Sequence, residues 1–257
     1  IDKVPKPSET EPMKLDELEY KDVRPSEIGM VAIKGNEISY LGHDINSYYN
    51  NYNGTKPEVS LDSIASRGGI SVLNHPGRYK FSSKWYADVY NRYNHIVGIE
   101  VFNCGNRYPN DRQKWDSILT ILSPSRPVWG FSNDDFHSMR DFGRNWNVFL
   151  LPELNQIEVR KAMENGIFYF VNAPEGQKGQ KPSEILSMEV NSRKKYISIV
   201  AANCDSIAWI SNGLIVGHGN ILDIRKLPAS CRYVRAELYG KGNSVVCTQP
   251  FNIISSR

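Results

Sequence analysis

A carboxylate and an imidazole stand two residues apart at the end of an apolar run in the middle of the chain. The stretch VWGFSNDDFH, residues 128–137, ends in Asp134, Asp135 and His137. Carboxylate and imidazole donors together suit Zn, Mn or Fe, whereas carboxylates alone suit Mg or Ca. Both residue types are also common in loops, so the pair needs partners before it predicts a metal site. Asp134 lies outside the Asp-x-His spacing, and we expect it either to hold a ligand in place or to cap the loop.

Three earlier apolar runs carry or end in side chains of the same kinds. They supply Glu37 in residues 29–39, His75 in residues 69–78 and Glu100 in residues 95–103. In a parallel α/β barrel the C-terminal ends of all strands lie on one face, so these groups would converge with Asp135 and His137. We predict that they hold clustered divalent ions, which would lower the pKa of a bound water and hold a phosphoryl group. The alternative for Glu37 and Glu100 is pairing with nearby arginines.

Strands and helices alternate along the first two thirds of the chain. Helical spacing of apolar residues predicts helices at residues 61–69, 111–122 and 154–166. Short apolar runs predict strands at residues 29–39, 69–78, 95–103, 126–137, 146–151 and 167–172. This alternation is typical of an α/β fold with parallel strands. His95 precedes its strand, so we expect it at the end opposite to the metal ligands.

The composition changes at residues 173–184, which are rich in Gly, Pro, Lys and Gln and form the predicted linker. We therefore divide the chain into a barrel portion, residues 29–175, and a C-terminal β-rich domain, residues 176–257. The β-branched and aromatic runs of the second part, separated by turn residues, predict a small all-β sandwich. Residues 1–28 are charged and rich in proline, and we expect a loop or surface segment there.

The totals exclude several classes of protein. The chain has 257 residues, of which 40% are hydrophobic and 23% charged, as in folded domains. Its net charge of +3 is too small to indicate a nucleic-acid surface. No apolar run reaches the roughly 18 residues that a membrane span requires. The four cysteines have no zinc-finger spacing. The sequence predicts neither a compartment nor an oligomeric state.

The order of the motifs resembles that of the PHP (polymerase and histidinol phosphatase) family of metal-dependent phosphoesterases. The matching stretches are GNEIS, a helix ending in RGG, ISVLNHPGR, GIEVFN, a helix with KWDSIL, and GFSNDDFH, over roughly residues 29–172. Their order and spacing, more than any single motif, carry the resemblance. It implies a distorted (β/α)7 TIM-like barrel with a cluster of divalent metals at the C-terminal ends of its strands.

The resemblance also implies roles for individual residues. The implied metal ligands are Glu37, which would bridge metals, His75, Asp135 and His137. Two neighbours compete for a further ligand position: the register favours Asp44, whereas the chemistry favours His43. Because the planar fork of arginine suits phosphate, we predict that Arg78 and Arg144 bind substrate. Glu100 lies near the site in the family pattern and is the third predicted substrate residue. Surface salt bridges are the alternative for the two arginines.

The chain departs from the family pattern at its beginning. The family opens with an HxHxxxSDG-like stretch and a TDH-like stretch, and none of the five histidines here precedes Glu37. We expect that this chain starts just after the TDH-like motif, so that it lacks the first barrel strands and holds an incomplete cluster of Zn, Mn or Fe. A natural variant with a reduced site is the alternative.

We predict a phosphoesterase that hydrolyses a small phosphorylated substrate, a phosphate mono- or diester, with a metal-bound hydroxide. The alternative is a non-catalytic or degenerate PHP-like binding module whose β-sandwich binds carbohydrate or protein. A metal-dependent amidohydrolase-type enzyme is a third interpretation, and the NHPG and NDDFH motifs fit it less well.

Overall fold

The computed structural model describes residues 24–39, 42–54 and 57–254. Most of the predicted surface segment, residues 1–28, therefore lies outside the described residues. Its last part, Pro25–Ile28, forms a short 3-10 helix.

Four α-helices occur in the described ranges. They are α1 (Pro57–Ser66), α2 (Ser83–Arg92), α3 (Asp111–Leu122) and α4 (Gln156–Asn165). The three predicted helices are confirmed as α1, α3 and α4. Helix α2 was not predicted, and it begins after Ser82, whose side chain accepts a hydrogen bond from the Trp85 N–H. None of the described helices has the length and apolar character that a membrane crossing requires.

The first sheet has five strands in the order β1-β2-β3-β4-β5. They are β1 (Gly35–Ile38), β2 (Ile45–Tyr48), β3 (Ile70–Leu73), β4 (Ile96–Asn103) and β5 (Trp129–Asn133). Strands β3, β4 and β5 run parallel, whereas β1–β2 and β2–β3 are antiparallel pairs. The sheet thus begins with a meander and continues with parallel strands.

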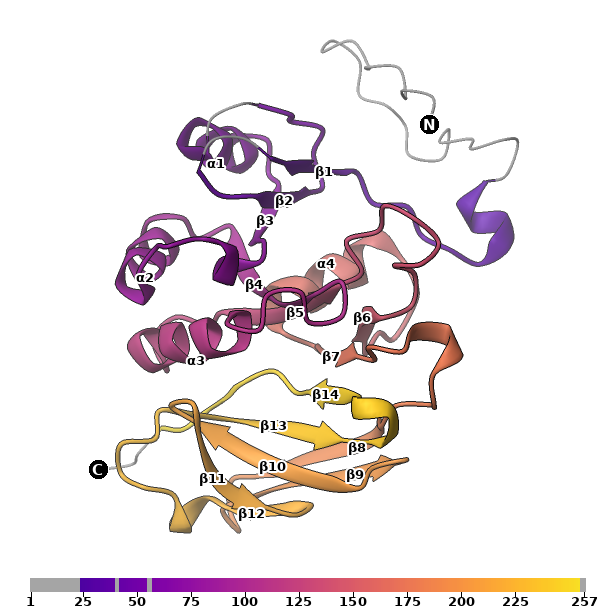
Figure 1. Cartoon of the computed structure of the whole chain (residues 1–257). Helices are drawn as coiled ribbons and strands as arrows, with labels where there is room; N and C mark the ends of the chain where they lie inside the picture. The colour runs from indigo at the N-terminus through magenta and orange to yellow at the C-terminus, as the bar shows by residue number, and fades with distance from the viewer. Residues whose placement is uncertain (1–23, 40–41, 55–56, 255–257) are drawn as a thin grey trace.

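Helices cover both faces of this sheet, because successive side chains of a strand point to opposite faces. Leu73 of β3 packs in a core with α1, α2 and α3. Ile70 and Val72 of the same strand pack in another core with Val159 and Met163 of α4. In Figure 1, α1, α2 and α3 accordingly lie along one side of the strands, and α4 lies behind β5.

The second sheet joins the two halves of the chain. Its path is β11-β10-β13-β14-β7-β6, and β15 also pairs with β13. The strands are β6 (Asn145–Phe149), β7 (Phe168–Asn172), β10 (Ser206–Ser211), β11 (Leu214–His218), β13 (Tyr233–Tyr239), β14 (Val245–Cys247) and β15 (Phe251–Asn252). Strand β7 lies before the predicted domain boundary at residues 175/176 and β14 lies after it, and the two strands pair. One sheet therefore contains strands from both predicted domains. The boundary itself stays a prediction.

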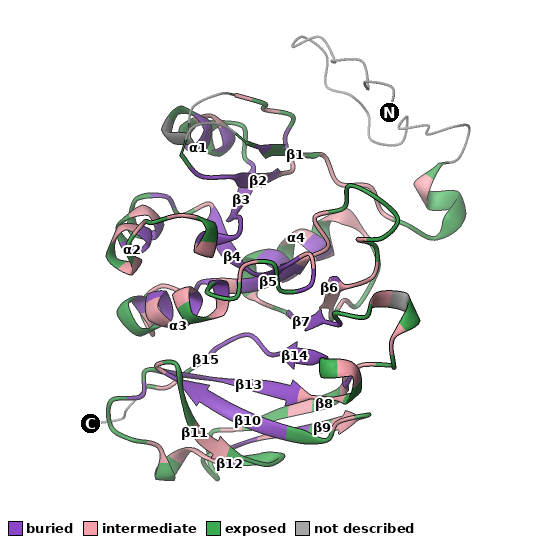
Figure 2. Cartoon of the chain, in the orientation of Figure 1, coloured by how far each residue is buried: buried purple, intermediate pink, exposed green. Residues whose placement is uncertain are grey.

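A third sheet packs against the second. Its order is β12-β9-β8, with β8 (Glu184–Asn191), β9 (Tyr196–Ala202) and β12 (Ile221–Asp223). Ile197 and Ile199 of β9 share a core with Trp209 of β10 and Val234 of β13. Figure 2 shows β10, β13 and β14 as largely buried strands between this layer and the first half of the chain.

The predicted distorted (β/α)7 barrel is wrong. A closed barrel of this kind needs parallel strands that are each followed by an outer helix, and the described chain has three sheets and four α-helices. The connection from β1 to β2, residues 39–44, is too short for the crossover that a parallel pair requires. The prediction of a separate all-β sandwich in the second half is also wrong. Its larger sheet includes β6 and β7, which come from the first half of the chain.

A buried charged cluster ties α3 to β13. Arg235, which is 1% exposed, donates to both carboxylate oxygens of Asp116 at 2.8 and 2.6 Å and to Glu237 at 2.7 Å. The Tyr233 hydroxyl donates to Asp116 at 2.8 Å, and the guanidinium lies over the Trp115 ring. Because buried charges are tolerated only when they are paired and hydrogen-bonded, this cluster fixes the position of the helix against the strand.

We expect Arg235→Met to lower the free energy of unfolding by about 3–5 kcal/mol, because Asp116 and Glu237 would keep buried charges without their partner. Urea denaturation measures the change. Arg225→Met is the matched control, since Arg225 pairs with Asp223 at the surface, and its effect should be much smaller. Equal effects of the two variants would contradict a structural role for the buried cluster.

The same cluster predicts a loss of stability in acid. Burial alone would raise the pKa of Glu237, but the charges of Arg235 and Arg112 outweigh burial and hold this pKa below its ordinary value of 4.5. The unfolded chain therefore binds more protons in this range, and the free energy of unfolding falls as the pH drops through it. Glu237→Gln should flatten the pH dependence between about pH 5 and 3 in urea titrations. An unchanged slope in this variant would show that Glu237 is not the group responsible.

Candidate metal centre

Two carboxylates and a histidine from neighbouring segments meet at one point. One ligand atom each from Glu37 in β1, Asp44 before β2 and His75 after β3 lie within 4.8 Å of one another. The order β1-β2-β3 places these segments side by side. Because a metal–ligand bond is about 2.0–2.2 Å long for these donors, small side-chain rotations bring all three onto one ion.

His75 is held at both ring nitrogens. Its Nδ1 lies 3.0 Å from Glu100 Oε2, and its backbone N–H donates to the same oxygen at 2.8 Å. Its Nε2 lies 2.9 Å from Asp44 Oδ2. A histidine ligand commonly donates its second ring N–H to a carboxylate, which fixes the tautomer and the ring plane. This arrangement leaves Nε2 as the nitrogen that faces the other two donors.

Glu100 is itself fixed by the ends of the parallel strands. Its side chain is 2% exposed and lies within β4, the strand between β3 and β5. It accepts hydrogen bonds from Asn103, the last residue of β4, at 3.2 Å and from Asn133, the last residue of β5, at 2.9 Å. These amides, together with His75, satisfy a carboxylate that would otherwise be costly to bury.

Two of the predicted ligands have a strained backbone. His75 has a φ of 28° and Asp135 a φ of 50°. L-residues rarely adopt such angles, which persist where the surroundings enforce them and which concentrate at functional sites. At His75 the enforcing contact follows in the next turn, where the Gly77 N–H donates to the buried Asp111 carboxylate. A Cβ at Gly77 would lie 2.6 Å from that carboxylate oxygen, so only glycine fits there.

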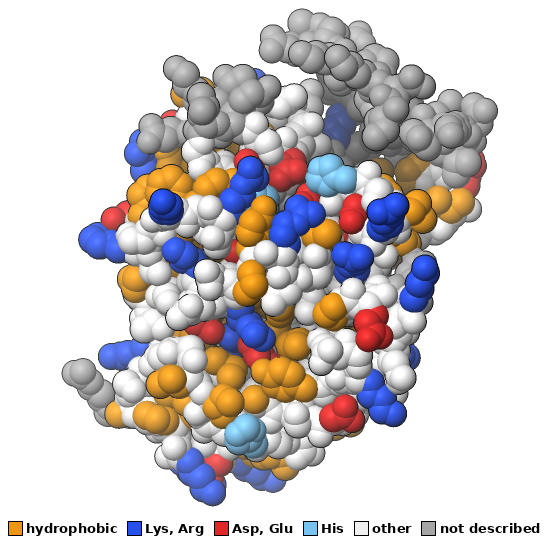
Figure 3. Space-filling model, in the orientation of Figure 1, with side chains coloured by type: hydrophobic (Ala, Val, Ile, Leu, Met, Phe, Trp, Pro, Cys, Tyr) orange, Lys and Arg blue, Asp and Glu red, His pale blue; other side chains and the backbone are white. Residues whose placement is uncertain are grey.

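An open cavity of about 320 Å³ lies beside this cluster. Four predicted site residues line it, together with two aromatic residues and four asparagines. They are Glu37, Glu100, Asp135, His137, Tyr48, Phe136, Asn46, Asn74, Asn103 and Asn133. The structure therefore gathers residues from four separate predicted strands around one space. Figure 3 shows basic side chains around a group of acidic and histidine side chains on this face of the molecule.

Asp135 and His137 form one lip of the cavity. Asp135 accepts a hydrogen bond from Arg107 at 2.7 Å. The His137 side chain is 74% exposed, and its Nδ1 lies 2.7 Å from the carbonyl oxygen of Asp135. Both residues face the space next to Glu37 but lie outside the Glu37–Asp44–His75 group. Their role as metal ligands stays a prediction.

His43 lies in a buried aromatic environment behind the cluster. Its Nδ1 is 2.8 Å from the carbonyl oxygen of Asp44, and its Nε2 is 2.8 Å from the Tyr86 hydroxyl. The ring packs against Tyr79, with centroids 4.2 Å apart. Burial lowers the pKa of His43 to about 4. Of the two competing neighbours, the structure places Asp44 in the group and His43 outside it.

The electrostatics of the cluster reflect crowded carboxylates. Partial burial of its carboxylate, with the charges of Asp135 and Asp44, raises the pKa of Glu37. Burial alone would raise the pKa of Asp44 as well, but hydrogen bonds from His75 and Tyr79 outweigh it and lower this pKa. Mutual repulsion of this kind is relieved by a cation placed between the carboxylates.

The predicted substrate residues occupy different places. Arg78 is 53% exposed and donates to Asp44 at 2.7 Å, so it stands at the edge of the cluster. The side chain of Arg144 runs beside Gly176 and is not among the residues that line the cavity in the described part of the chain. Glu100 is buried behind His75.

Asp134 confirms its predicted capping role. Its carboxylate accepts the backbone N–H groups of Gly143, Arg144 and Asn145 at 2.7–2.8 Å. It thereby closes the loop that carries Asp135 and His137.

The sequence analysis did not predict the asparagines around the cavity, although their positions in the sequence follow a pattern. Asn74 follows β3 directly, and Asn103 and Asn133 are the last residues of β4 and β5. An asparagine at the end of each parallel strand is the pattern that could have marked them. Asn74 donates to Glu37 at 2.9 Å and to Asn46 at 3.0 Å, so it positions one of the predicted ligands.

Comparison with known proteins gives local similarity. No family model matches the chain. A stretch of 82 residues is 34% identical to the 5'-3' exoribonuclease Rnm of Escherichia coli (strain K12) and, equally, of Salmonella typhimurium (strain LT2). Each match covers 31% of this chain and 26% of the relative, so the chain spans about a quarter of the length of these curated relatives.

Among solved structures, the chain is similar to a two-domain protein from Bacteroides vulgatus that contains a predicted PHP-like metal-dependent phosphoesterase. The sequence identity is 14% and the TM-score is 0.47, with 89% of this chain and 76% of that chain covered.

We expect Glu100→Gln to weaken the binding of Zn²⁺ or Mn²⁺ by about 10- to 100-fold, since residues that orient a metal-bound histidine contribute that much to affinity. Isothermal titration calorimetry measures the change, and near-UV circular dichroism checks that the variant is folded. Glu153→Gln, at an exposed position, is the control and should bind as the unaltered protein does. Equal affinities of the two variants would show that Glu100 does not support a metal ligand.

Proposed function

We propose that this protein is a metal-dependent hydrolase of phosphate esters. The observation that carries the proposal is the convergence of Glu37, Asp44 and His75 on one point. Two carboxylate oxygens and one imidazole nitrogen suit Zn, Mn or Fe, and the hydrogen bond from the other nitrogen of His75 to Glu100 is typical of a metal-bound histidine. A divalent ion held there would supply Lewis-acid chemistry at a phosphoryl oxygen and would activate a water molecule.

The contacts support particular roles within this proposal. Asp44 takes the ligand position for which His43 was the other candidate, because both ring nitrogens of His43 have other partners. Glu100 orients His75 from behind, which favours a positioning role over substrate contact. Asp135 and His137 complete the ligand set from the opposite lip of the cavity.

Two arginines are placed to bind phosphate oxygens. Arg78 contacts Asp44, and Arg107 contacts Asp135, each through one terminal nitrogen. Both side chains are about half exposed, at 53% and 43%. Their remaining N–H groups can therefore take phosphate oxygens in the paired geometry that guanidinium favours. Arg107 therefore joins Arg78 as a proposed phosphate-binding residue. Arg144 does not, because its side chain lies beside Gly176.

A nucleotide-containing substrate is the finer form of the proposal. Phe136 lines the cavity with its side chain exposed, at 56% for the residue. An exposed aromatic ring beside arginines is the combination on which single-stranded bases stack. The local similarity to an enzyme named as an exoribonuclease supports the same choice.

Asp44→Asn should reduce the hydrolysis of 4-nitrophenyl phosphate or bis(4-nitrophenyl) phosphate by about 1,000-fold with Mn²⁺ or Zn²⁺ present, because loss of the ion removes several kcal/mol of transition-state stabilisation. Absorbance measures the rate at a metal concentration that just saturates the unaltered protein. Asp88→Asn is the matched control, since Asp88 pairs with Lys84 at the surface. A short 5'-phosphorylated RNA tests the nucleotide form.

The outcomes separate the two candidate classes. Hydrolysis of any of these esters that is lost in Asp44→Asn and kept in Asp88→Asn supports the enzyme. Metal binding without hydrolysis of the three substrates would overturn the enzyme and leave the degenerate binding module. Hydrolysis unaffected by Asp44→Asn would show that the metal centre is misassigned.

A further inference from the structure

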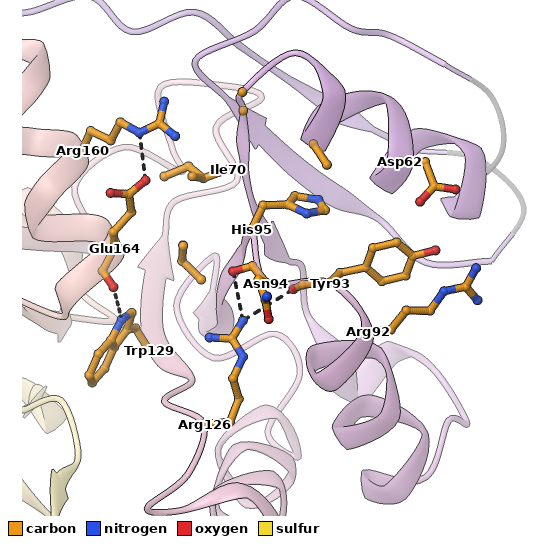
Figure 4. A pocket seen from close by; sticks show the side chains of 14 residues that line it. Asp62, Ile70, Arg92, Tyr93, Asn94, His95, Arg126, Trp129, Arg160 and Glu164 are labelled. Atoms are coloured by element: carbon orange, nitrogen blue, oxygen red, sulfur yellow. Dashed lines mark hydrogen bonds and ion pairs between the residues drawn. The ribbon is translucent and has the colours of Figure 1, made fainter.

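A second and larger cavity lies at the opposite ends of the parallel strands. Its volume is about 710 Å³, within the range of roughly 300–1,000 Å³ that small-molecule sites occupy. Its floor includes Ile70 at the start of β3 and Val97 near the start of β4, and its walls come from the ends of α1 and α2 and from α4 (Figure 4). The metal-centre residues lie within β1 and β4, directly before β2, or after β3 and β5, and none of them lines this cavity, so the cavity is distinct from that site.

Three arginines line this cavity, and in the described part of the chain only one of them has a carboxylate partner. Arg160 pairs with Glu164 at 2.8 Å. Arg126 donates to backbone carbonyls alone, including those of Ile96 at 2.7 Å and Tyr90 at 3.3 Å. Arg92 lies over the Tyr93 ring, 5.0 Å from its centroid. Two guanidinium groups of the lining therefore have no acidic partner among the described residues, and Figure 4 shows Arg92 at the edge of the cavity, pointing away from Arg126.

The hydrogen bonds of Arg126 leave one terminal nitrogen of its guanidinium group free to bind a ligand. The carbonyls it contacts lie at the end of α2 and just beyond, so this arginine also has a structural role in capping the helix. One terminal nitrogen, NH1, has a single long contact, 3.4 Å to the carbonyl oxygen of Pro127. Figure 4 shows the guanidinium pointing into the middle of the cavity, between Trp129 and His95. An anionic oxygen there would receive charge-assisted hydrogen bonds.

His95 adds an unsatisfied polar group to the same wall. Its Nε2 is buried and has no hydrogen-bond partner among the described residues. Buried polar atoms are nearly always paired, so an orphaned one needs an explanation. Burial keeps the pKa of His95 below its ordinary value, so the ring is neutral near pH 7 and can both donate and accept.

The rest of the lining combines polar residues, Asp62, Asn94 and Glu164, with an apolar and aromatic part. Ile70, Val97 and the rings of Trp129 and Tyr93 line the cavity. The indole of Trp129 is held in place, because its Nε1 donates to the Glu164 carbonyl at 3.0 Å and Gly166 packs directly against its ring. Apolar walls with a few convergent polar groups are typical of sites for small organic ligands.

We propose that this cavity binds a small organic anion that carries a flat ring, with its carboxylate or phosphate at Arg126 and its ring against Trp129 and Ile70. The size of the cavity, the guanidinium of Arg126 and the fixed ring of Trp129 favour such a ligand. The site is independent of the proposed hydrolytic function, because it shares no residue with the metal centre.

The test compares three probes of equal shape on the full chain with EDTA present, so that binding at the metal centre does not contribute. The probes are 2-naphthoate, 2-naphthyl phosphate and the neutral 2-naphthamide. The readout is the indole N–H resonance of Trp129 in two-dimensional NMR, assigned with Trp129→Phe. We expect saturable shifts with at least one anion and at least tenfold weaker binding of the amide. The tighter of the two anions identifies the ligand as a carboxylate or a phosphate.

Two variants locate the binding. Arg126→Gln should weaken the anion about tenfold, since a hydrogen bond to a charged group is worth about 1.5–3 kcal/mol, and near-UV circular dichroism checks that this variant is folded. Ala65→Trp, at an exposed position of α1 on the cavity wall, should abolish binding by filling the space. Arg193→Gln, on the β8–β9 connection, is the matched control and should change nothing. Absence of any saturable shift, equal binding of the amide, or unchanged affinity in Ala65→Trp would each overturn the proposal.

Discussion

The chain of hydrogen bonds from Glu100 through His75 to Asp44 is the constraint on which the rest of the site depends. A carboxylate buried in an interior strand of a sheet, as Glu100 is in β4, is costly unless every oxygen is bonded. The partners of Glu100 come from the ends of β3, β4 and β5. Satisfying this one group therefore fixes the relative positions of three strand ends and turns His75 towards the carboxylates of the antiparallel strands.

The two ends of the parallel strands differ in charge for a related reason. The ends that carry the metal centre gather Glu37, Asp44, Glu100 and Asp135. At the other ends, α1 and α2 terminate, and the carbonyl ends of helices favour nearby cations. Arg92 in the last turn of α2 and Arg126 at the carbonyls beyond it follow this rule. One sheet thus separates an acidic cluster from a basic cavity.

The second half of the chain contacts the elements around the five-stranded sheet. Strand β14 pairs with β7, and Arg235 of β13 is bonded to Asp116 of α3. Both contacts join residues that are about 70 or more positions apart, and both are buried. The helix that contains Asp116 begins at Asp111, whose carboxylate holds the turn after His75. A physical path of direct contacts therefore leads from the β-rich half to the proposed ligand.

The sequence by itself determined the local elements and the kinds of chemistry. The helices α1, α3 and α4 and the strands β3 to β7 follow from spacing, because apolar periodicity reports which side chains one element can bury. It also marked Glu37, His75, Glu100, Asp135 and His137, since their residue types show which ions they suit. Only the tertiary structure decided which strands pair. The antiparallel meander β1-β2-β3 and the pairing of β14 with β7 replace the predicted barrel, because strand partners are selected by contacts between distant residues. The tertiary structure also shows which of His43 and Asp44 lies in the candidate metal centre. His43 is buried against Tyr86 and Tyr79, whereas Asp44 faces Glu37 and His75.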